Sequence, residues 1–328
     1  KKKFMEENTE QRVDLTLFSE KIQELKDRIA CVIVGQEQTV DLVLTAILAN
    51  GHVLIEGVPG VAKTLLARLT ARLIDADFSR IQFTPDLMPS DVLGTTVFNM
   101  KTNGFDFHQG PIFADIVLVD EINRAPAKTQ AALFEVMEER QISIDGTTHR
   151  MGDLYTILAT QNPVEQEGTY KLPEAQLDRF LMKITMDYPS LEEEVNILER
   201  HHTNAALVKL DDITPAITKE EVLSLRAFMN QVFVDRTLLQ YIALIVQQTR
   251  TSKAVYLGAS PRASVAMLQS SKAYALLQGR DFVTPEDIKF VAPYVLQHRL
   301  ILTAEAEMEG YSPVKVTQRL IDKVEVPK

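Results

Sequence analysis

The stretch His52-Val-Leu-Ile-Glu56-Gly57-Val-Pro-Gly60-Val-Ala62-Lys63-Thr64 decides the fold of this chain. A short apolar run at residues 52–56 predicts a strand, and residues 62–74 predict a helix behind a glycine-containing loop. The loop is nearly the phosphate-binding pattern G-x-x-x-x-G-K-[ST], in which backbone N–H groups and a helix N-terminus face the phosphates. We therefore expect a nucleotide-binding domain around this strand, loop and helix.

Two side chains of the loop have expected tasks in binding a nucleotide. Lys63 should reach the β- and γ-phosphates, and the Thr64 hydroxyl should ligate Mg²⁺. Ala62 stands where the general pattern has its second glycine, and the loop can keep its form if Ala62 has helical φ and ψ angles. The residues expected around the nucleotide are Gly57, Val58, Pro59, Gly60, Val61, Ala62, Lys63, Thr64 and Leu65.

Length and charge limit the function further. A chain of 328 residues with 45% hydrophobic and 24% charged residues predicts about two globular domains. Its net charge of −10 speaks against binding nucleic acid through the overall field. Residues 1–187 carry 19 basic and 28 acidic residues, so most of the acidity lies in the part that must bind phosphate. The positive charge for a nucleotide must therefore come from a few placed residues.

Cysteine use and hydropathy bear on location. Cys31 is the single cysteine, which excludes an internal disulfide and a cysteine zinc site and fits the reducing cytoplasm. Because it lies in the apolar run 31–34, we expect it to be buried. No apolar stretch approaches 18 residues, so we expect no membrane span.

The order of elements predicts an α/β domain followed by a helical one. Apolar, non-alternating strands at residues 80–83, 116–120 and 155–160 are separated by helices such as 126–139, which favours a parallel sheet covered on both faces. Residues 83–113 form an inserted element, and residues 141–150 around Asp145-Gly146 predict a hairpin.

The predicted domain limits follow from these patterns. We expect a mobile segment at 1–17, the nucleotide-binding domain at 18–187, a linker helix and loop at 188–215, and a small all-helical domain at 216–328. The linker helix opens on the capping box of Ser190, and the helices of the second domain begin near Thr218, Arg236, Ser260 and Thr284.

Acidic and amide side chains follow the apolar strands. Asp120 and Glu121 end one strand, where the carboxyl edge of a parallel sheet binds ligands. Asp120 would hold Mg²⁺ through water, and Glu121 would polarise the attacking water; a solvated strand end is the alternative. Asn162 ends the next strand and could orient the water or sense the γ-phosphate, or it could simply form an Asn-Pro turn.

Two arginines could supply charge to a transition state. Arg179, in Leu177-Asp-Arg-Phe180, is either a finger delivered to the nucleotide of a neighbouring subunit or half of a structural Asp–Arg pair. Arg262 lies in the first turn of a helix, where a cation opposes the helix dipole, so we expect an anionic partner. Arg124 could contact a neighbour or cap a local turn, and the six histidines show no zinc pattern.

In this order, the motifs resemble those of the AAA+ ATPases, and closely those of the MoxR family in the clade with an insert at helix 2. The resemblance covers about residues 18–300 and rests on residues 34–36, 57–64 (Walker A), 118–125 (Walker B), 159–163 (sensor 1), 174–180 (finger) and 258–263 (sensor 2). Residues 83–113 match the helix 2 insert, and residues 141–150 match the hairpin before sensor 1.

The resemblance implies an ATPase that uses ATP and Mg²⁺ and assembles with its own copies as a ring, usually a hexamer. It implies a chaperone that remodels or matures protein clients, often partners with von Willebrand factor A domains. It places residues 32–35, Val34 and Gly35 among them, near the adenine. It leaves open whether Arg262 serves its own site or that of a neighbour.

Two other functions compete with this one. The first is a nucleic-acid motor or nuclease-associated subunit of the same fold, against which the acidic balance speaks. The second is a nucleotide-gated scaffold with little hydrolysis, against which the presence of Glu121, Asn162 and Arg179 speaks. The phenylalanines of the insert, Phe98, Phe105 and Phe107, could contact a client, but we expect them to pack as a small core.

Overall fold

The computed structural model describes residues 15–163, 168–203 and 213–327. Of the segment expected to be mobile, 1–17, residues 1–14 lie outside the described residues. Residues 15–17 form the start of helix α2 (Leu15–Val32). Cys31 is exposed, so the expectation of a buried thiol was wrong. The helix continues past Ile29, which is buried, and two residues along a helix turn the side chain to the opposite side.

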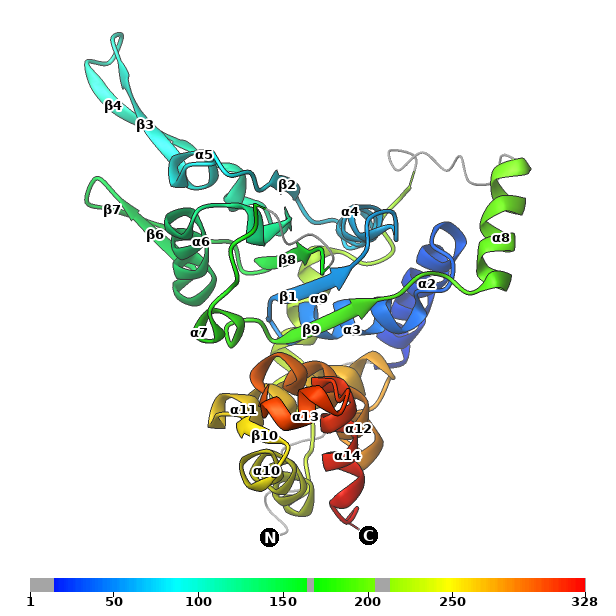
Figure 1. Cartoon of the computed structure of the whole chain (residues 1–328). Helices are drawn as coiled ribbons and strands as arrows, with labels where there is room; N and C mark the ends of the chain where they lie inside the picture. Colours follow the sequence, from blue (N-terminus) through cyan, green and yellow to red (C-terminus); the bar gives the residue numbers. More distant parts are fainter. Residues whose placement is uncertain (1–14, 164–167, 204–212, 328) are drawn as a thin grey trace, which may run out of the picture.

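A five-stranded parallel sheet forms the centre of the first domain, in the order β2-β5-β8-β1-β9 (Figure 1). The strands are β1 (Val53–Gly57), β2 (Phe78–Gln82), β5 (Ile116–Asp120), β8 (Thr156–Gln161) and β9 (Met182–Met186). Successive residues of β5 enter two different cores: Ile116 and Leu118 pack with α3 and α4, while Val117 and Val119 pack with α6. The sheet is thus covered on both faces, as its continuous apolar runs predicted.

The helices around the sheet are α3 (Glu37–Leu48), α4 (Lys63–Leu73) and α6 (Ala127–Glu139). The insert contains α5 (Pro89–Leu93) and the antiparallel hairpin β3 (Gly94–Asn99) and β4 (Gly104–Gln109), which projects from the domain (Figure 1). A second hairpin, β6 (Gln141–Ile144) and β7 (Thr147–Arg150), turns at two residues with positive φ, Asp145 (51°) and Gly146 (78°). An Asp-Gly pair favours this turn, and the hairpin prediction is confirmed.

The phenylalanines of the insert do not form the expected core. Phe98 and Phe105 face each other across the hairpin at 5.2 Å and remain 47% and 74% exposed. A two-stranded hairpin has no further layer to cover them. Only Phe107 packs, against Phe113 and at 4.3 Å from the ring of His149 in the second hairpin.

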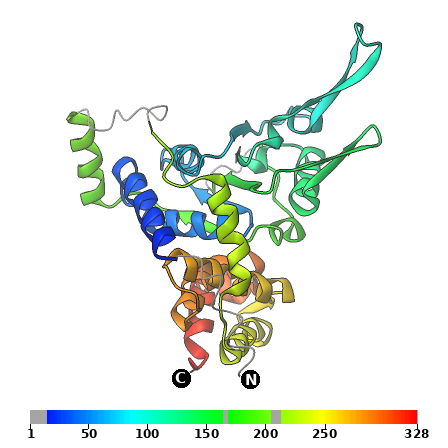
Figure 2. The ribbon, with the colours of Figure 1, turned by 180° about the vertical axis from the view of Figure 1, so that it is seen from behind.

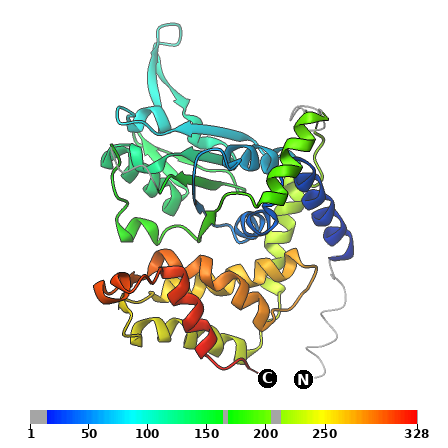
Figure 3. The ribbon, with the colours of Figure 1, turned by 45° about the vertical axis from the view of Figure 1, so that its right-hand side comes forward.

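The second part of the chain is a helical domain below the sheet (Figure 3). It follows the short helix α7 (Glu174–Leu177), strand β9 and helix α8 (Leu191–His202), and Figure 2 shows the face on which α9 (Lys219–Phe228) lies. Its helices are α10 (Arg236–Thr251), α11 (Pro261–Leu277), α12 (Pro285–Leu296), α13 (Ala304–Met308) and α14 (Pro313–Lys323). The prediction of a purely helical domain needs one correction, because β10 (Val255–Leu257) and β11 (Ile301–Leu302) pair as a small antiparallel sheet.

One hydrophobic cluster joins the two domains. It contains buried residues of β1 and α3 in the first domain and of α11 and α12 in the second. Within the described parts of the chain, no helix is long and apolar enough to cross a membrane.

Candidate nucleotide-binding site

The loop between β1 and α4 has two positions with positive φ. Gly60 has φ +89°, and Ala62 has φ 63° and ψ 22°, in the left-handed region. Ala62 therefore does not have the helical φ and ψ angles that were the stated condition for the loop to keep its form. A loop that turns successive N–H groups toward an anion alternates right- and left-handed residues, and alanine adopts the second conformation at a cost of about 1–2 kcal/mol.

A cavity of about 400 Å³ lies between this loop and the carboxyl ends of β2, β5 and β8. The residues that line it are Pro59, Gly60, Ala62, Lys63, Thr64, Leu65, Arg80, Gln82, Asp120, Glu121, Thr160 and Asn162. The Lys63 amino group donates to the Gly57 carbonyl oxygen. Burial lowers the pKa of Lys63, and the carboxylates of Asp120 and Glu121 act in the opposite direction. An anionic ligand would add to the groups that favour the charged lysine.

The two acidic residues face this cavity because the chain turns at the second of them. Glu121 has φ 56°, and its N–H donates to the Thr160 hydroxyl oxygen at 3.0 Å. Asp120 is buried; one carboxylate oxygen accepts from the Thr160 hydroxyl at 3.0 Å and the other from Arg80 Nε at 2.6 Å. A carboxylate, the Thr64 hydroxyl and water are the oxygen ligands that Mg²⁺ prefers, so this donor set fits the ion.

Three polar residues of the cavity were missed in the sequence: Arg80, Gln82 and Thr160. Gln82 donates to a Glu121 carboxylate oxygen at 2.8 Å, and Arg124 lies 3.1 Å from the same oxygen. Within its own chain, Arg124 thus forms an ion pair with Glu121. Arg80 and Gln82 could have been found only from the register of the strands, since Gln82 pairs with Asp120 in the parallel ladder and β2 therefore ends beside β5.

A second cavity of about 230 Å³, which we call the base-side cavity, adjoins the first, the phosphate cavity, and shares Gly60, Ala62 and Leu65 with it. Its other lining residues are Val32, Ile33, Val34, Gln36, Val61, Pro189, Ile197, Arg200 and His201. Mostly apolar walls beside a phosphate loop suit a flat heterocyclic base. Three residues expected at the nucleotide, Gly35, Gly57 and Val58, line neither cavity. Gly57 lies close to the Met186 carbonyl, and Val58 packs on the core. Gly35 (φ +72°) lies near Glu193.

The structure places Arg179 and Arg262 together, outside both cavities. Arg262 Nη2 lies 2.6 Å and Arg179 Nε 4.0 Å from the carboxylate of Glu138, at the end of α6. Arg262 Nη1 also lies 3.9 Å from Asp178. Within the chain, the anionic partners of Arg262 are thus the carboxylates of Glu138 and Asp178.

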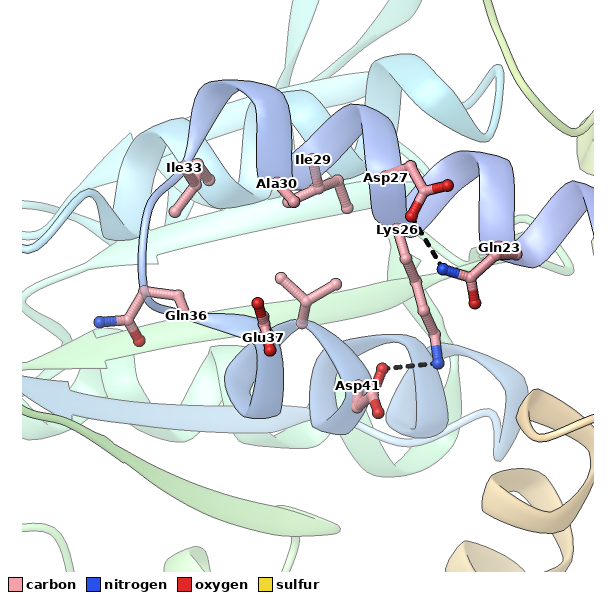
Figure 4. A pocket seen from close by; sticks show the side chains of 10 residues that line it. Gln23, Lys26, Asp27, Ile29, Ala30, Ile33, Gln36, Glu37 and Asp41 are labelled. Carbon is pink, nitrogen blue, oxygen red and sulfur yellow. Dashed lines mark hydrogen bonds and ion pairs between the residues drawn. The ribbon is translucent and has the colours of Figure 1, made fainter. Parts of the chain in front are cut away.

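A third cavity, of about 300 Å³, lies between α2 and α3 (Figure 4). Its polar side chains bind one another: Lys26 pairs with Asp41 at 2.8 Å, and Gln23 donates to Asp27 at 2.8 Å. It shares Ile33 and Gln36 with the base-side cavity but contains no residue of the phosphate loop. We therefore assign the chemistry to the cavity between the loop and Asp120.

The described residues contain no group of three His, Cys, Asp or Glu side chains that could hold a metal ion by themselves. His52 and His298 are buried and bind backbone atoms, as expected for structural histidines.

Comparison with known proteins agrees with this geometry. The model of the ATPase family associated with various cellular activities (AAA) matches residues 52–182, and the AAA lid domain matches residues 247–322. The chain is 48% identical to YeaC of Bacillus subtilis, with 90% of this chain and 92% of that protein covered, and 44% identical to Chaperone MoxR1 of Mycobacterium tuberculosis, with 90% and 80% covered.

More distant in sequence is Protein MoxR of Methylorubrum extorquens, 30% identical over 90% of this chain and 91% of that protein. A crystal structure from Cytophaga hutchinsonii superposes with a TM-score of 0.87 at 41% identity, covering 96% of this chain and 97% of that one. With the phosphate loop, the acidic pair and the helical lid in place, the chain belongs to the MoxR family of AAA+ ATPases.

Proposed function

We propose that this protein hydrolyses ATP with Mg²⁺, assembles as a ring of identical subunits, and uses the energy to remodel or mature client proteins. The observation that carries the proposal is that the charged groups of a hydrolytic site lie at two separate places on the chain. Lys63, Thr64, Asp120 and Glu121 line one cavity, while the arginines that would complete a hydrolytic site lie on another part of the surface.

The cavity residues expected from the sequence each have a task in this mechanism. The loop N–H groups and Lys63 bind the β- and γ-phosphates, and Thr64 and Asp120 would hold Mg²⁺, the latter through water. The ion, when bound, neutralises charge that develops on the phosphates. Glu121 orients and polarises the attacking water, and Asn162, buried beside it, fixes the water or the γ-phosphate.

The position of the arginines supports the proposed assembly. Because Arg179 and Arg262 line neither cavity of their own chain, we infer that both serve the nucleotide of a neighbouring subunit. In the ring, the γ-phosphate of that nucleotide would replace Glu138 as their anionic partner. A guanidinium in this role stabilises the negative charge of the transition state.

The chaperone role rests on the relatives, one of which is named a chaperone. The number of subunits, expected to be six, and a partner with a von Willebrand factor A domain belong to the same family-based proposal. The exposed Phe98 and Phe105 on the projecting hairpin offer apolar surface for such a client.

Steady-state turnover tests the mechanism directly. Lys63→Ala and Glu121→Gln should each lower kcat by at least about 10²-fold, since each removes a group that acts on transition-state charge or on the water. Arg68→Ala, an exposed cation on the same helix α4, is the matched control and should keep wild-type turnover. Wild-type rates in both site variants would refute the mechanism.

Two further measurements separate the alternatives. Turnover per chain should rise with protein concentration, because the arginines act between subunits; a flat profile contradicts the ring. Affinity capture with Glu121→Gln held in ATP should retain a protein client, whereas stimulation of turnover by DNA would favour the nucleic-acid motor.

A further inference from the structure

Three consecutive residues of the lid bind the segment that carries Arg179. Gln297, His298 and Arg299 form a single 3-10 turn, η5 (Gln297–Arg299), directly after α12. Gln297 Nε2 donates to the Lys183 carbonyl at 2.5 Å, and His298 Nε2 lies 3.0 Å from the Phe180 carbonyl. Strand β9 is the last strand of the sheet, so this turn covers part of an edge that would otherwise be open.

Arg299 uses every one of its N–H donors, and four of the five bind the segment that carries Arg179. Its side chain is 4% exposed. Nε donates to the Asp178 carboxylate at 2.6 Å, Nη2 to the carbonyls of Asp178 (3.1 Å) and Phe180 (2.8 Å), and Nη1 to the carbonyls of Leu181 (3.2 Å) and Val295 (2.5 Å). A guanidinium has five N–H donors in a rigid fork, and four of the five end on residues 178–181.

These bonds fix the backbone on both sides of Arg179. Asp178 and Phe180 are its chain neighbours, and both give their carbonyl oxygens to Arg299. The helix before them, α7, is only four residues long, and the Phe180 ring is anchored edge-to-face on Phe134 at 5.8 Å. The position of the Arg179 side chain therefore depends on the lid as well as on the sheet domain.

We propose that Arg299 is a positioning residue for the arginine finger: it ties the finger segment of a subunit to that subunit's own lid, so that the lid sets where Arg179 meets the neighbour's nucleotide. The inference rests on the proposed role of Arg179 in a neighbouring site. Arg299 itself touches no nucleotide, because it lines neither the phosphate cavity nor the base-side cavity.

The first test is Arg299→Lys in the full-length protein. Lysine keeps the charge but has three donors on a single atom, so it cannot hold the carboxylate and three carbonyls at once. We expect kcat to fall about 10- to 100-fold, the range that a displacement of about 1 Å produces, with the Kd for ATP unchanged. Asp178→Asn, which keeps the shape of the partner, should lower kcat in the same direction.

The second test mixes subunits. Glu121→Gln chains are inactive but present an intact finger, and Arg299→Lys chains have an intact cavity but a misplaced finger. A mixture should therefore turn over ATP several-fold faster than the mean of the two variants measured separately. Arg179→Ala mixed with Glu121→Gln chains should show the same rescue, since it tests the finger without Arg299.

The control is Arg280→Lys, which alters another Arg–Asp pair of the lid. Arg280 binds Asp287 through two bonds of 2.8 and 2.5 Å, away from the finger segment, and should keep wild-type kcat. If Arg179→Ala is rescued but Arg299→Lys is not, Arg299 has only a structural role within its own subunit and the inference is wrong. If neither is rescued, the finger itself, and with it the proposed function, is wrong. Wild-type kcat in Arg299→Lys would also overturn the inference.

Discussion

The left-handed conformation of Ala62 leads to a prediction whose sign depends on the structure. Ala62 has φ 63° at the last position before α4, whereas Ala67 is buried in the interior of α4. Replacing each by glycine makes the same chemical change in two backbone conformations. Ala62→Gly should not destabilise the protein, whereas Ala67→Gly should.

The magnitudes follow from two opposing contributions. Glycine relieves about 1–2 kcal/mol of left-handed strain at position 62. It also gives the unfolded chain more freedom, which lowers the free energy of unfolding by about 0.4–1 kcal/mol. The net change at position 62 is between about 0 and +1.5 kcal/mol. At position 67, without strain to relieve, glycine should lower the free energy of unfolding by about 1 kcal/mol or more.

Urea unfolding of the nucleotide-free protein measures both changes. Ala62→Val extends the series, because a β-branched residue at positive φ is a strong outlier and should lower the free energy of unfolding by about 1–3 kcal/mol. If Ala62→Gly were as destabilising as Ala67→Gly and valine were tolerated, position 62 would be helical and the described loop geometry would be refuted.

Two other predictions concern buried hydrogen bonds. Burial lowers the pKa of His52 to about 3, while its neutral ring lies 3.1 Å from the Met137 carbonyl and accepts from the Ile157 N–H at 3.0 Å. The folded pKa is below the unfolded value of about 6.5. The contribution of the neutral His52 ring to the free energy of unfolding is therefore complete above pH 6.5 and is lost as the pH falls, by about 1.4 kcal/mol per pH unit. His52→Gln can keep both bonds and should reduce the slope of the free energy of unfolding against pH, by about 0.7 kcal/mol per pH unit at pH 6.5 and by about 1.4 at pH 5. Parallel slopes of the two proteins would contradict this. Thr160→Val removes the hydroxyl shared by Asp120 and the Glu121 N–H, so stability should fall by about 1–3 kcal/mol and kcat by about tenfold, whereas Thr160→Ser should retain both; equal activity of the two variants would argue against this role.

The sequence predicted the elements whose signals are local. Strand β5 has the predicted limits 116–120 because four apolar residues, 116–119, end at the acidic pair Asp120 and Glu121. Ser190 and Thr218 cap α8 and α9, as their capping boxes indicate. Strand β9 was missed although Met182-Lys-Ile-Thr-Met186 alternates apolar and polar residues, the pattern of a strand that buries one side; it pairs with β1 at the edge of the sheet.

The rest depends on contacts between distant parts of the chain. Strands β10 and β11 are three and two residues long, which is too short for a periodic pattern in the sequence. They form because distant residues such as Leu257 and Ile301 pair. Arg80 and Gln82 enter the site through strand register, and Arg299 meets Asp178 across 121 positions of sequence. The candidate site residues were accessible from motifs, but the left-handed Ala62 and the grouping of Arg179 with Arg262 required the fold.

The two projecting hairpins have a mechanical consequence. The β3–β4 hairpin leads through a single 3-10 turn into β5, and the β6–β7 hairpin leads through a short connection into β8. Phe107 and His149 join the hairpins at 4.3 Å. Strands β5 and β8 end at the phosphate cavity, and five residues of strand span about 16 Å. A push or pull on either hairpin would thus be transmitted along hydrogen-bonded strands to Asp120, Glu121 and Asn162 at the cavity. Under the proposed function, load on the hairpins would then change the rate of hydrolysis.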